Sequence, residues 1–370
     1  MTRFLTIKET AEMMRVSRQT IYGWINKGKL RPVKTPGGRF RIPEDQLIIA
    51  KLEPAKRTTP NLFPIRDISD LEPEEPELLG TKDKDWFGRS QKHWYWNCEG
   101  TRFLYKAGRE GTGENWSEKV ACELCKLLGL PHAEYDLAIY HGKKGVITPS
   151  FVPEGARLEL GNEILAHYVS GYEKIKRFSQ TQHTLMRVFK LVGRKEVKLP
   201  IGFLGFDNVN SATDVFVGYL MLDAWIANQD RHHENWGYVI ELSNGSIHLA
   251  PTFDHASSLG RNESDATRER RLTTSDVGMS MLRYVERAKS AFYWTSNDTK
   301  PLLTIDAFIK AAQIRKDASR SWLQQLDKIS SSDTRAIIDR VPEEEMSDTA
   351  KEFTQRILDL NRKRLLATGG

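Results

Sequence analysis

The sequence has few cysteines and no long apolar run, and each absence excludes a class of protein. Only three cysteines occur among 370 residues, at Cys98, Cys122 and Cys125, which is too few for the disulfide framework of a small secreted domain. No apolar stretch approaches the roughly 20 residues that a membrane-spanning helix requires. The first residues, MTRFLTIKET, lack the apolar core and cleavage site of a signal peptide. We therefore expect a cytoplasmic protein that does not enter a membrane.

The length and the charge distribution indicate more than one domain. A chain of 370 residues exceeds the size of one small core, and two or three domains are expected. The net charge is +6, but residues 1–57 hold 13 Lys or Arg against 5 Asp or Glu, so this segment carries +8 and the remainder −2. This asymmetry predicts a polyanionic partner for the N-terminal module alone. A solvated basic face is the alternative.

Residues 6–26 have the pattern of two short helices joined by a tight turn. Thr6 and Glu9 are spaced as a capping box for the first helix. Ser17 is placed to cap the second helix, which Gly28 ends. In a helix-turn-helix, the exposed residues at the start of the second helix meet the base edges of DNA, and here they are Arg18, Gln19 and Tyr22.

The next segment, LRPVKTPGGRFRI at residues 30–42, predicts a β-hairpin around a Pro-Gly-Gly turn. In its return strand Arg39 and Arg41 share one face, and Phe40 and Ile42 share the other. A hairpin that packs apolar residues inward and presents arginines outward is typical of a DNA-binding wing, which phosphate contacts position. A small helical protein-interaction domain is the alternative.

This N-terminal module resembles a known group of DNA-binding domains. The strings LTIKETAEMMRVSRQTIYGWINKGKL and GGRFRI, within residues 4–50, resemble the excisionase and MerR-type winged helices. The resemblance implies binding to double-stranded DNA at an operator or attachment site through residues 1–53. It also favours a homodimer or repeated copies on the DNA.

Residues 54–79 predict a linker. They contain five prolines and an acidic cluster from Asp67 to Glu77, and neither a helical nor a strand period persists. Such a composition is typical of a semi-rigid, mostly disordered tether.

The strongest chemical signal is the string NQDRHHEN at residues 228–235. It follows residues 214–227, which are apolar on nearly all sides and therefore predict a helix at the centre of a core. After it come two predicted strands, 236–241 and 246–251, joined by an Asn-Gly hairpin turn. The hairpin brings the string Phe-Asp-His at residues 253–255 back towards the polar loop.

Asp230, Asn235 and Asp254 form a set that phosphoryl transfer to a hydroxyl requires. One carboxylate orients the hydroxyl and accepts its proton, which we assign to Asp230. An Asn and an Asp, here Asn235 and Asp254, hold Mg²⁺ against the nucleotide phosphates. The spacing between Asp230 and Asn235 equals that of the kinase catalytic loop.

Three other interpretations remain open for these residues. Asp230 and Arg231 would form a structural ion pair, or Asp254 would cap a turn. His232, His233 and His255 would bind zinc, although no recognised ligand spacing accompanies them. Cys122 and Cys125 fall within a predicted helix, at positions typical of buried apolar residues.

Residues 86–152 can supply a nucleotide-binding lobe. A strand with the sequence RFLYK ends in Lys106, which can reach the α- and β-phosphates. Glu118, on the first turn of a predicted helix at 115–128, is placed to pair with Lys106. A strand-end lysine and a glutamate on a first helical turn are also common without this role. The other candidates are a phosphate-binding turn with Gly88, Arg89 and Ser90, and a hinge at 147–152 whose Phe151 and Val152 would meet adenine.

Residues from about 80 to 367 resemble HipA-like serine/threonine kinases of bacterial toxin–antitoxin modules. The resemblance lies in YKAGREGTGENWSEKVACELCKLLGLP, IANQDRHHENWG, APTFDHASSLG and the C-terminal IIDRVPEEEMSDTAKEFTQRILDLNRKRLLA. It implies a bilobal α+β fold with an N-lobe at 80–153 and a mainly helical C-lobe at 154–370. It also implies Lys106 as the phosphate-binding lysine of ATP, Asp230 as catalytic, Asn235 and Asp254 as Mg²⁺ ligands, and transfer to Ser or Thr of a protein.

The sequence departs from that family in two ways. The family's phosphate loop is only loosely matched at Gly88–Lys92. Family members work with a separate DNA-binding antitoxin, whereas a winged helix of another type is fused here. The resemblance implies a bacterial or mobile-element origin, an antitoxin as a partner, and a toxin or stress regulator that represses its own promoter.

Beyond Asp254, residues 261–278 are polar and lie where kinases place an activation segment; a mobile surface loop is the alternative. Residues 304–327 and 347–366 predict amphipathic packing helices. Two other functions stay open for the whole chain: a DNA-binding regulator whose kinase-like domain only senses nucleotide, and a transferase of phosphate or AMP to a non-protein acceptor.

Overall fold

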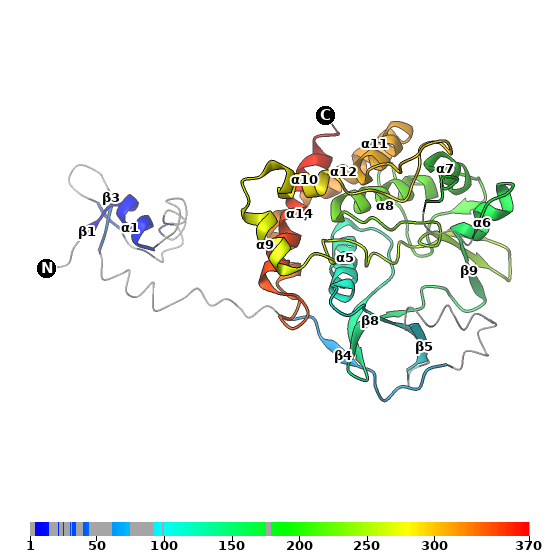
Figure 1. The fold of residues 1–370 in the computed structure, drawn as a ribbon, viewed down its shortest axis with the longest axis horizontal. Coiled ribbons are helices and arrows are strands. Elements are labelled where there is room, and N and C mark those ends of the chain that lie inside the picture. Colours follow the sequence, from blue (N-terminus) through cyan, green and yellow to red (C-terminus); the bar gives the residue numbers. More distant parts are fainter. Residues whose placement is uncertain are drawn as a thin grey trace. The chain divides into compact units, whose positions relative to one another are not determined.

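The computed structural model describes residues 4–14, 21, 25, 30, 32–34, 40–43, 61–74, 92–97, 100–174 and 179–369. The chain divides into two units, Met1–Asn61 and Leu62–Gly370 (Figure 1). Within the described ranges, no helix combines the length and the apolar character needed to cross a membrane.

The small unit is built on α1 (Ile7–Met14) and a three-stranded sheet of order β1-β3-β2. The predicted capping box is present: Glu9 N–H donates to Thr6 Oγ1 at 3.1 Å, and Thr6 N–H donates to Glu9 Oε2 at 2.7 Å. A small core is buried between the helix and the sheet, and its members are Leu5, Ala11, Ile21, Leu30 and Ile42.

The predicted wing hairpin is confirmed in its two strands. β2 (Val33–Lys34) pairs antiparallel with β3 (Phe40–Pro43), which pairs on its other side with β1 (Phe4–Leu5). Ile42 is fully buried, as the alternation predicts, whereas Arg41 is partly exposed. The other predicted DNA-contact residues, Arg18, Gln19, Tyr22 and Arg39, lie outside the described residues.

The large unit contains a five-stranded sheet of order β4-β7-β8-β6-β5 (Figure 1). Its central strands are β6 (Arg102–Ala107), β7 (Asp136–Tyr140) and β8 (Lys143–Pro149), and β5 (Lys92–Trp96) forms one edge. The strands predicted around HWYW and RFLYK are therefore confirmed. Helix α5 (Glu114–Leu128) connects β6 to β7 and packs on β7 and β8.

The predicted linker extends too far into the large unit. The short strand β4 (Ile65–Asp67) pairs in parallel with β7 and forms the other edge of the sheet. Phe63 is buried beneath the cations of Lys119 and Arg340. This edge strand was not predicted, because three paired residues are too few to show a strand period and the surrounding segment is rich in proline. Residues 54–60 and 75–79 of the predicted linker lie outside the described residues.

A second sheet of order β10-β12-β11-β9 lies beside the helical part of the unit. The predicted hairpin is confirmed as β11 (Gly237–Glu241) and β12 (Ile247–Leu249), with Gly245 at φ +71° in the turn. β9 (Ala156–Leu160) pairs with β11, and β10 (Val197–Lys198) pairs with β12. This hairpin carries the chain from the polar loop at 228–235 to Asp254.

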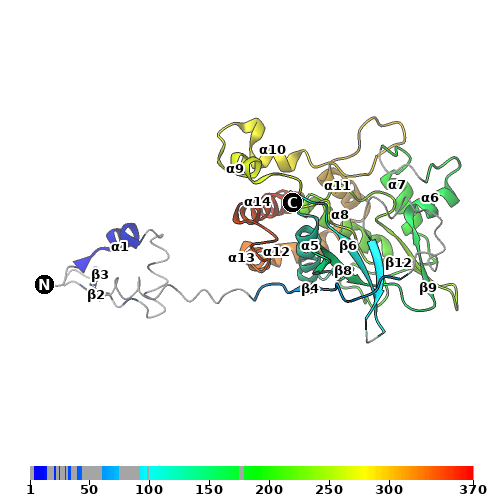
Figure 2. The ribbon, with the colours of Figure 1, turned by 60° about the horizontal axis from the view of Figure 1, so that its bottom comes forward.

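Helix α8 (Ala212–Ile226) is the centre of the core, as its all-round apolar sequence predicts, since every residue in it is buried. The helices α7 (Leu185–Val192), α11 (Thr304–Ile314), α12 (Lys316–Lys328) and α14 (Asp348–Leu366) pack against it. Figure 2 shows α5 and α8 between the sheets and the outer helices. The shorter helix α6 (Gly161–Tyr168) follows β9.

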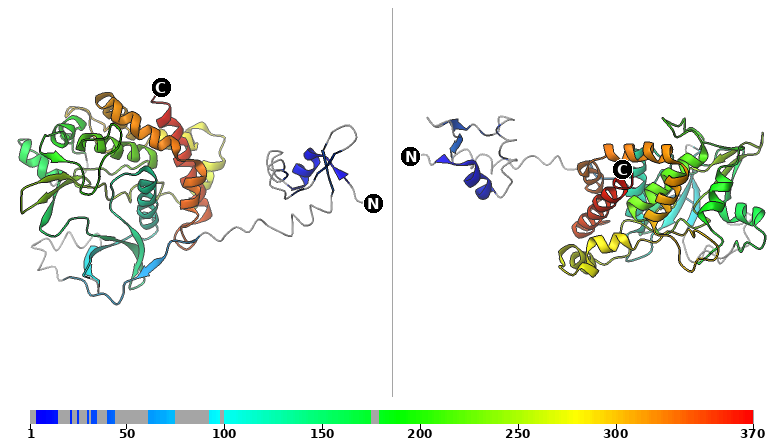
Figure 3. Two further views of the ribbon diagram at one scale, coloured as in Figure 1. Left: turned by 180° about the vertical axis from the view of Figure 1, so that it is seen from behind. Right: turned by 90° about the horizontal axis from the view of Figure 1, so that it is seen from above.

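The C-terminal helices follow the sequence pattern with one difference. The helix predicted at 304–327 is two helices, because Arg315 leaves the helical conformation (φ −126°, ψ 65°) and its guanidinium binds Asp214 of α8 at 2.7 Å. The helix predicted at 347–366 is confirmed, with Ser347 capping α14. Figure 3 shows α14 in red beside α12 and α13 (Ser331–Ile338) in orange.

The polar segment 261–278 is not simply a surface loop. It contains α9 (Asp265–Thr273), which Ser264 caps, followed by a 3₁₀ turn at Val277–Met279 and by α10 (Met281–Glu286). Helix α9 packs against α14. The sequence of α9 shows no apolar face, because Arg268 is the only residue of this helix that is buried. The helix was therefore not predicted.

Candidate active site

The polar loop at 228–235 is held by a buried ion pair at the end of α8. Arg231 is 1% exposed; its Nη2 donates to Asp223 Oδ1 at 2.7 Å, and its Nε also contacts that carboxylate. Asn228 Nδ2 donates to the same Asp223 Oδ1 at 2.8 Å. A buried cation and a buried carboxylate are tolerated only when each satisfies the other. The pair therefore fixes the loop on the most buried helix of the protein.

Asp230 and Asn235 lie at the two ends of this loop and contact each other. Asn235 Nδ2 donates to the backbone carbonyl of Asp230 at 2.6 Å, so the amide oxygen of Asn235 is the atom that a metal ion could use. Ser257 Oγ donates to Asp230 Oδ2 at 3.1 Å. Asp230 therefore accepts this hydrogen bond, and its alternative role in an ion pair with Arg231 is wrong, since Arg231 binds Asp223.

Burial raises the pKa of Asp230, and the nearby negative charge of Asp254 raises it further, while His232 and the Ser257 hydrogen bond act in the opposite direction. The segment that follows Asp254 lies against the loop of Asp230, since Gln229 N–H donates to the carbonyl oxygen of Ser257 at 3.2 Å. A raised pKa also matches the requirement for a carboxylate that accepts a proton.

Asp254 follows β12 on a strained stretch of backbone. Its φ is +57°, in the left-handed region that few residues other than glycine adopt. Its backbone N–H donates to the phenolic oxygen of Tyr135 at 3.3 Å. The preceding Phe253 stacks on Phe151 with ring centroids 5.4 Å apart. The Asp254 carboxylate pairs with Lys106, which a role as a turn cap alone does not explain.

Lys106 connects the predicted nucleotide-binding residues with the predicted catalytic residues. Its Nζ forms an ion pair with Asp254 Oδ1 and lies 3.5 Å from Glu118 Oε2. Lys106 comes from β6, Glu118 from α5 and Asp254 from the loop after β12. The predicted Lys106–Glu118 pair is therefore present, and it also reaches the predicted metal-binding aspartate.

Glu118 is fully buried and binds the Asp254 loop directly. Its Oε1 accepts the backbone N–H of His255 at 2.6 Å. The ring of His255 is held from the other side by Thr252 Oγ1, 2.7 Å from Nε2. Glu118 therefore ties the loop of Asp254 to α5 through a hydrogen bond to the backbone.

The charges of Lys106, Glu118 and Asp254 stabilise one another. Burial by itself would lower the pKa of Lys106, but Asp254 and Glu118 outweigh it and hold that pKa above its usual value. Burial likewise would raise the pKa of Asp254, but the cations of Lys106 and Lys92 hold it well below its usual value. Lys106 is therefore an ammonium group and Asp254 a carboxylate at neutral pH.

The sequence did not indicate three residues that support Asp230, namely Ser257, Arg261 and Glu114. Arg261 Nη2 donates to Ser257 Oγ at 2.8 Å, and Arg261 also contacts Glu114 at the start of α5. Ser257 therefore connects Asp230 to a buried cation. Only the spacing of a Ser and an Arg after Asp254 could have indicated them, and such spacing is common.

Other predicted site residues are placed differently. Gly88, Arg89 and Ser90 lie outside the described residues. Phe151 contacts the site through Phe253, and Val152 N–H is bound to Ser150 Oγ at 3.3 Å. The histidines weighed as zinc ligands have separate partners: His233 Nδ1 lies 2.7 Å from Tyr172 Oη, and His232 Nδ1 accepts Glu234 N–H at 3.1 Å.

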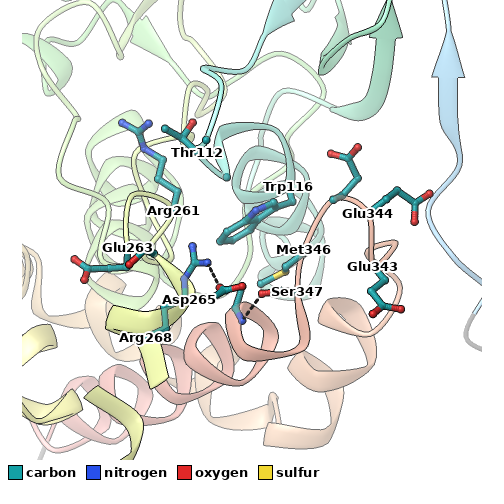
Figure 4. A pocket seen from close by; sticks show the side chains of 15 residues that line it. Thr112, Trp116, Arg261, Glu263, Asp265, Arg268, Glu343, Glu344, Met346 and Ser347 are labelled. Carbon is teal, nitrogen blue, oxygen red and sulfur yellow. Dashed lines mark hydrogen bonds and ion pairs between the residues drawn. The ribbon is translucent and has the colours of Figure 1, made fainter. Parts of the chain in front are cut away.

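A pocket of about 370 Å³ adjoins this network (Figure 4). It lies at the N-terminal ends of α5, α9 and α14, and Arg261 connects it to Ser257. In Figure 4 the guanidinium of Arg268 is paired with Asp265 below the ring of Trp116. None of the described site residues from the sequence prediction lines this pocket.

Known proteins match each part of the chain. Residues 4–48 match the family model of a helix-turn-helix domain. The serine/threonine-protein kinase CtkA of Helicobacter pylori is 23% identical over 256 residues, which cover 68% of this chain and 70% of that protein. The crystal structure of that organism's proinflammatory kinase CtkA matches with a TM-score of 0.64 and 21% identity, covering 83% of this chain and 97% of that one. The large unit has the fold of the kinase CtkA.

The predicted combination of a kinase-like α+β domain with an N-terminal helix-turn-helix is therefore confirmed. A more distant structural match is a chain in the complex of the Shewanella oneidensis MR-1 toxin–antitoxin system HipA, HipB and its operator DNA. It has a TM-score of 0.45 and 11% identity, and it covers 96% of this chain and 81% of that one.

Proposed function

We propose that this protein is a serine/threonine protein kinase that uses ATP and Mg²⁺ and binds DNA through its N-terminal domain. The observation that supports this proposal best is the position of Lys106, which contacts both Glu118 and Asp254. A phosphate-binding lysine that is fixed by a helix glutamate beside a metal-binding aspartate is the arrangement that phosphoryl transfer requires. The similarity to a protein named as a serine/threonine kinase supports the same reaction.

The donor set fits a magnesium ion. Asp254 offers a carboxylate and Asn235 an amide oxygen, and Mg²⁺ prefers oxygen ligands. When bound, Mg²⁺ would neutralise negative charge on the phosphates of ATP. Lys106 would add its positive charge to the α- and β-phosphates after exchanging its contact with Asp254 for a contact with them.

Asp230 would orient the acceptor hydroxyl and take its proton. A bond forms between the hydroxyl oxygen and the γ-phosphorus, and the bond from that phosphorus to the β–γ bridging oxygen breaks, so that ADP leaves. The raised pKa of Asp230, caused first by burial, brings this carboxylate nearer to the value at which proton acceptance is efficient. Ser257 and Arg261 would hold it in place.

The helix-turn-helix at residues 4–48 supports binding to double-stranded DNA. The segment up to residue 57 carries a net charge of +8, which favours phosphate contacts. We assign base contacts to Arg18, Gln19 and Tyr22 and wing contacts to Arg39 and Arg41. Autoregulation of transcription, an antitoxin partner and a homodimer on the DNA belong to the same proposal.

The kinase proposal is tested with γ-labelled ATP and Mg²⁺, using the full chain and a mixture of cellular proteins. We expect label on protein, recovered as phosphoserine or phosphothreonine after acid hydrolysis, and none with Asp230→Ala. Label on a small molecule would assign a different acceptor. ATP binding without any transfer would favour a nucleotide-sensing DNA-binding regulator.

A further inference from the structure

A cluster of potential metal ligands lies beside α5, one helical turn after Glu118. Cys122 Sγ, the imidazole of His132 and the carboxylate of Glu134 each offer a ligand atom, and these atoms all lie within 4.8 Å of one another. Cys122 comes from α5, while the other two come from the segment between α5 and β7. None of these residues takes part in the candidate active site.

The separations between the ligand atoms fit a tetrahedral zinc ion. Sγ of Cys122 lies 3.5 Å from Glu134 Oε2, and Nε2 of His132 lies 3.4 Å from Glu134 Oε1. With zinc distances of about 2.3 Å to sulfur and about 2.0–2.2 Å to nitrogen and oxygen, tetrahedral ligand atoms are roughly 3.3–3.7 Å apart. His132 Nε2 and Glu134 Oε1 already stand at this separation, and Cys122 Sγ lies within 4.8 Å of both side chains' ligand atoms.

The imidazole of His132 is oriented as a metal ligand. Its Nδ1 lies 2.6 Å from the carbonyl oxygen of Leu130, to which it donates. Its Nε2 then carries the lone pair, and this atom is buried without a hydrogen-bond partner. Metal-binding histidines commonly use one ring nitrogen for a carbonyl and the other for the ion. A buried polar atom without a partner otherwise costs stability.

The surroundings of the other two side chains also suit an ion. Cys122 is fully buried and its sulfur accepts the backbone N–H of Tyr135 at 3.4 Å. Glu134 is 51% exposed, so its side of the cluster is open to water. Lys126 and Cys122 both contact Glu134 Oε2, at 2.7 and 3.5 Å, so Oε1, 3.4 Å from His132 Nε2, is the oxygen that Glu134 would offer to a metal. Burial raises the pKa of the Cys122 thiol to about 12, so a bound dication would be needed to hold it as a thiolate.

We propose that Cys122, His132 and Glu134 form a zinc site, with a water molecule as the fourth ligand. Binding would displace the thiol proton of Cys122 to solvent, and the two negative ligands would balance the dication. Sequence analysis placed Cys122 and Cys125 together as buried core residues. This remains the assignment for Cys125, which is fully buried and is not a member of the cluster.

The site would brace the kinase-like domain near Asp254. The ligand segment is bound to the strand that leads there, since Ala133 N–H donates to Thr252 O and Thr252 N–H to Pro131 O, both at 2.9 Å. Thr252 Oγ1 also contacts His255. A zinc ion would therefore tie the C-terminal half of α5 to the support of the Asp254 loop.

The test is the zinc content of the purified full chain after treatment with a chelator, addition of Zn²⁺ and removal of the excess. We expect this cluster to bind about one zinc per chain in the wild type and to lose it in Cys122→Ala and His132→Ala. The matched control Cys125→Ala removes an equally buried thiol from the same helix and should retain zinc. Co²⁺ should give the charge-transfer absorption of a cobalt–thiolate bond in the wild type and in Cys125→Ala only.

Because core substitutions can unfold a protein, surface variants provide a second measurement. Glu134→Gln should bind Zn²⁺ at least about tenfold more weakly, whereas Lys126→Gln, which removes only the neighbouring cation, should retain tight binding. A wild-type chain without stoichiometric zinc would overturn the proposal, as would equal loss in Cys125→Ala and Cys122→Ala. Unchanged affinity in Glu134→Gln would overturn the three-ligand site.

Discussion

The buried carboxylate of Glu118 accepts the backbone N–H of His255 at 2.6 Å through one oxygen, while its other oxygen lies 3.5 Å from Lys106 Nζ. One side chain of α5 thus holds both the phosphate-binding lysine and the loop of Asp254. A change in the position of α5 would alter both at once, which makes this helix the element on which the geometry of the proposed active site depends.

Glu118→Gln should therefore lower phosphotransfer more than a loss of one ion pair suggests. The amide can still accept the His255 N–H but cannot balance the charge of Lys106, and we expect kcat/KM to fall by about 10²-fold. Steady-state kinetics with ATP as the varied substrate measure this. The control is Glu110→Gln, an exposed residue just before the helix, for which an equal loss would contradict the role of Glu118.

The acid limb of the pH–rate profile should report the raised pKa of Asp230. Transfer requires the carboxylate form, so activity should be lost on the acid side at a pH above the ordinary range of an aspartate. His232 lowers the pKa of Asp230, so His232→Gln should move this acid limb to higher pH. A pH–rate profile of both proteins checks the shift. An unchanged acid limb would show that Asp230 does not set it.

Breaking the ion pair beneath the catalytic loop should destabilise the large unit. Asp223→Asn leaves the guanidinium of Arg231, which is 1% exposed, without its charge partner, at an expected cost of about 3–5 kcal/mol. Denaturant titration gives the free energy of unfolding. The matched control is Asp317→Asn, which breaks the exposed pair with Arg320 and should change that free energy by less than about 1 kcal/mol. Similar values for both variants would contradict this account.

The wing prediction concerns DNA affinity alone. Arg41→Ala should weaken binding to double-stranded DNA and lower the slope of log affinity against log salt by about 1, as expected for one lost phosphate contact. Fluorescence anisotropy at several salt concentrations measures both quantities. Arg320→Ala in the large unit is the control and should change neither. If Arg41→Ala also leaves both unchanged, the wing does not contact phosphate.

Much of the candidate site could be predicted because its residues follow strong local patterns. The all-round apolar sequence of α8 located a buried helix, and the Asn-Gly turn placed Asp254 opposite the loop at 228–235. Lys106 and Glu118 followed from a strand and a helix of ordinary periodicity. The structure adds that Lys106 and Glu118 contact the Asp254 loop and that Ser257 of this loop binds Asp230.

The remaining features depend on contacts that no local pattern contains. Strand β4 has three residues and is stabilised by pairing with β7, some 70 positions later. Asp223 is a polar residue within an apolar helix and is explained only by Arg231. The cluster of Cys122, His132 and Glu134 lacks the spacing of known zinc motifs, because a tight turn after α5 brings its members together.

The central claim is that Lys106, Asp230 and Asp254 perform phosphotransfer, and the most direct test measures ATP binding and transfer in the same samples. We expect the wild type to bind Mg·ATP and to label protein. Asp230→Asn should bind Mg·ATP with unchanged affinity yet lose transfer by at least about 10³-fold, while Lys106→Met should lose both binding and transfer. Transfer that persists in Asp230→Asn, or a folded wild type that binds Mg·ATP without any transfer, would contradict the account.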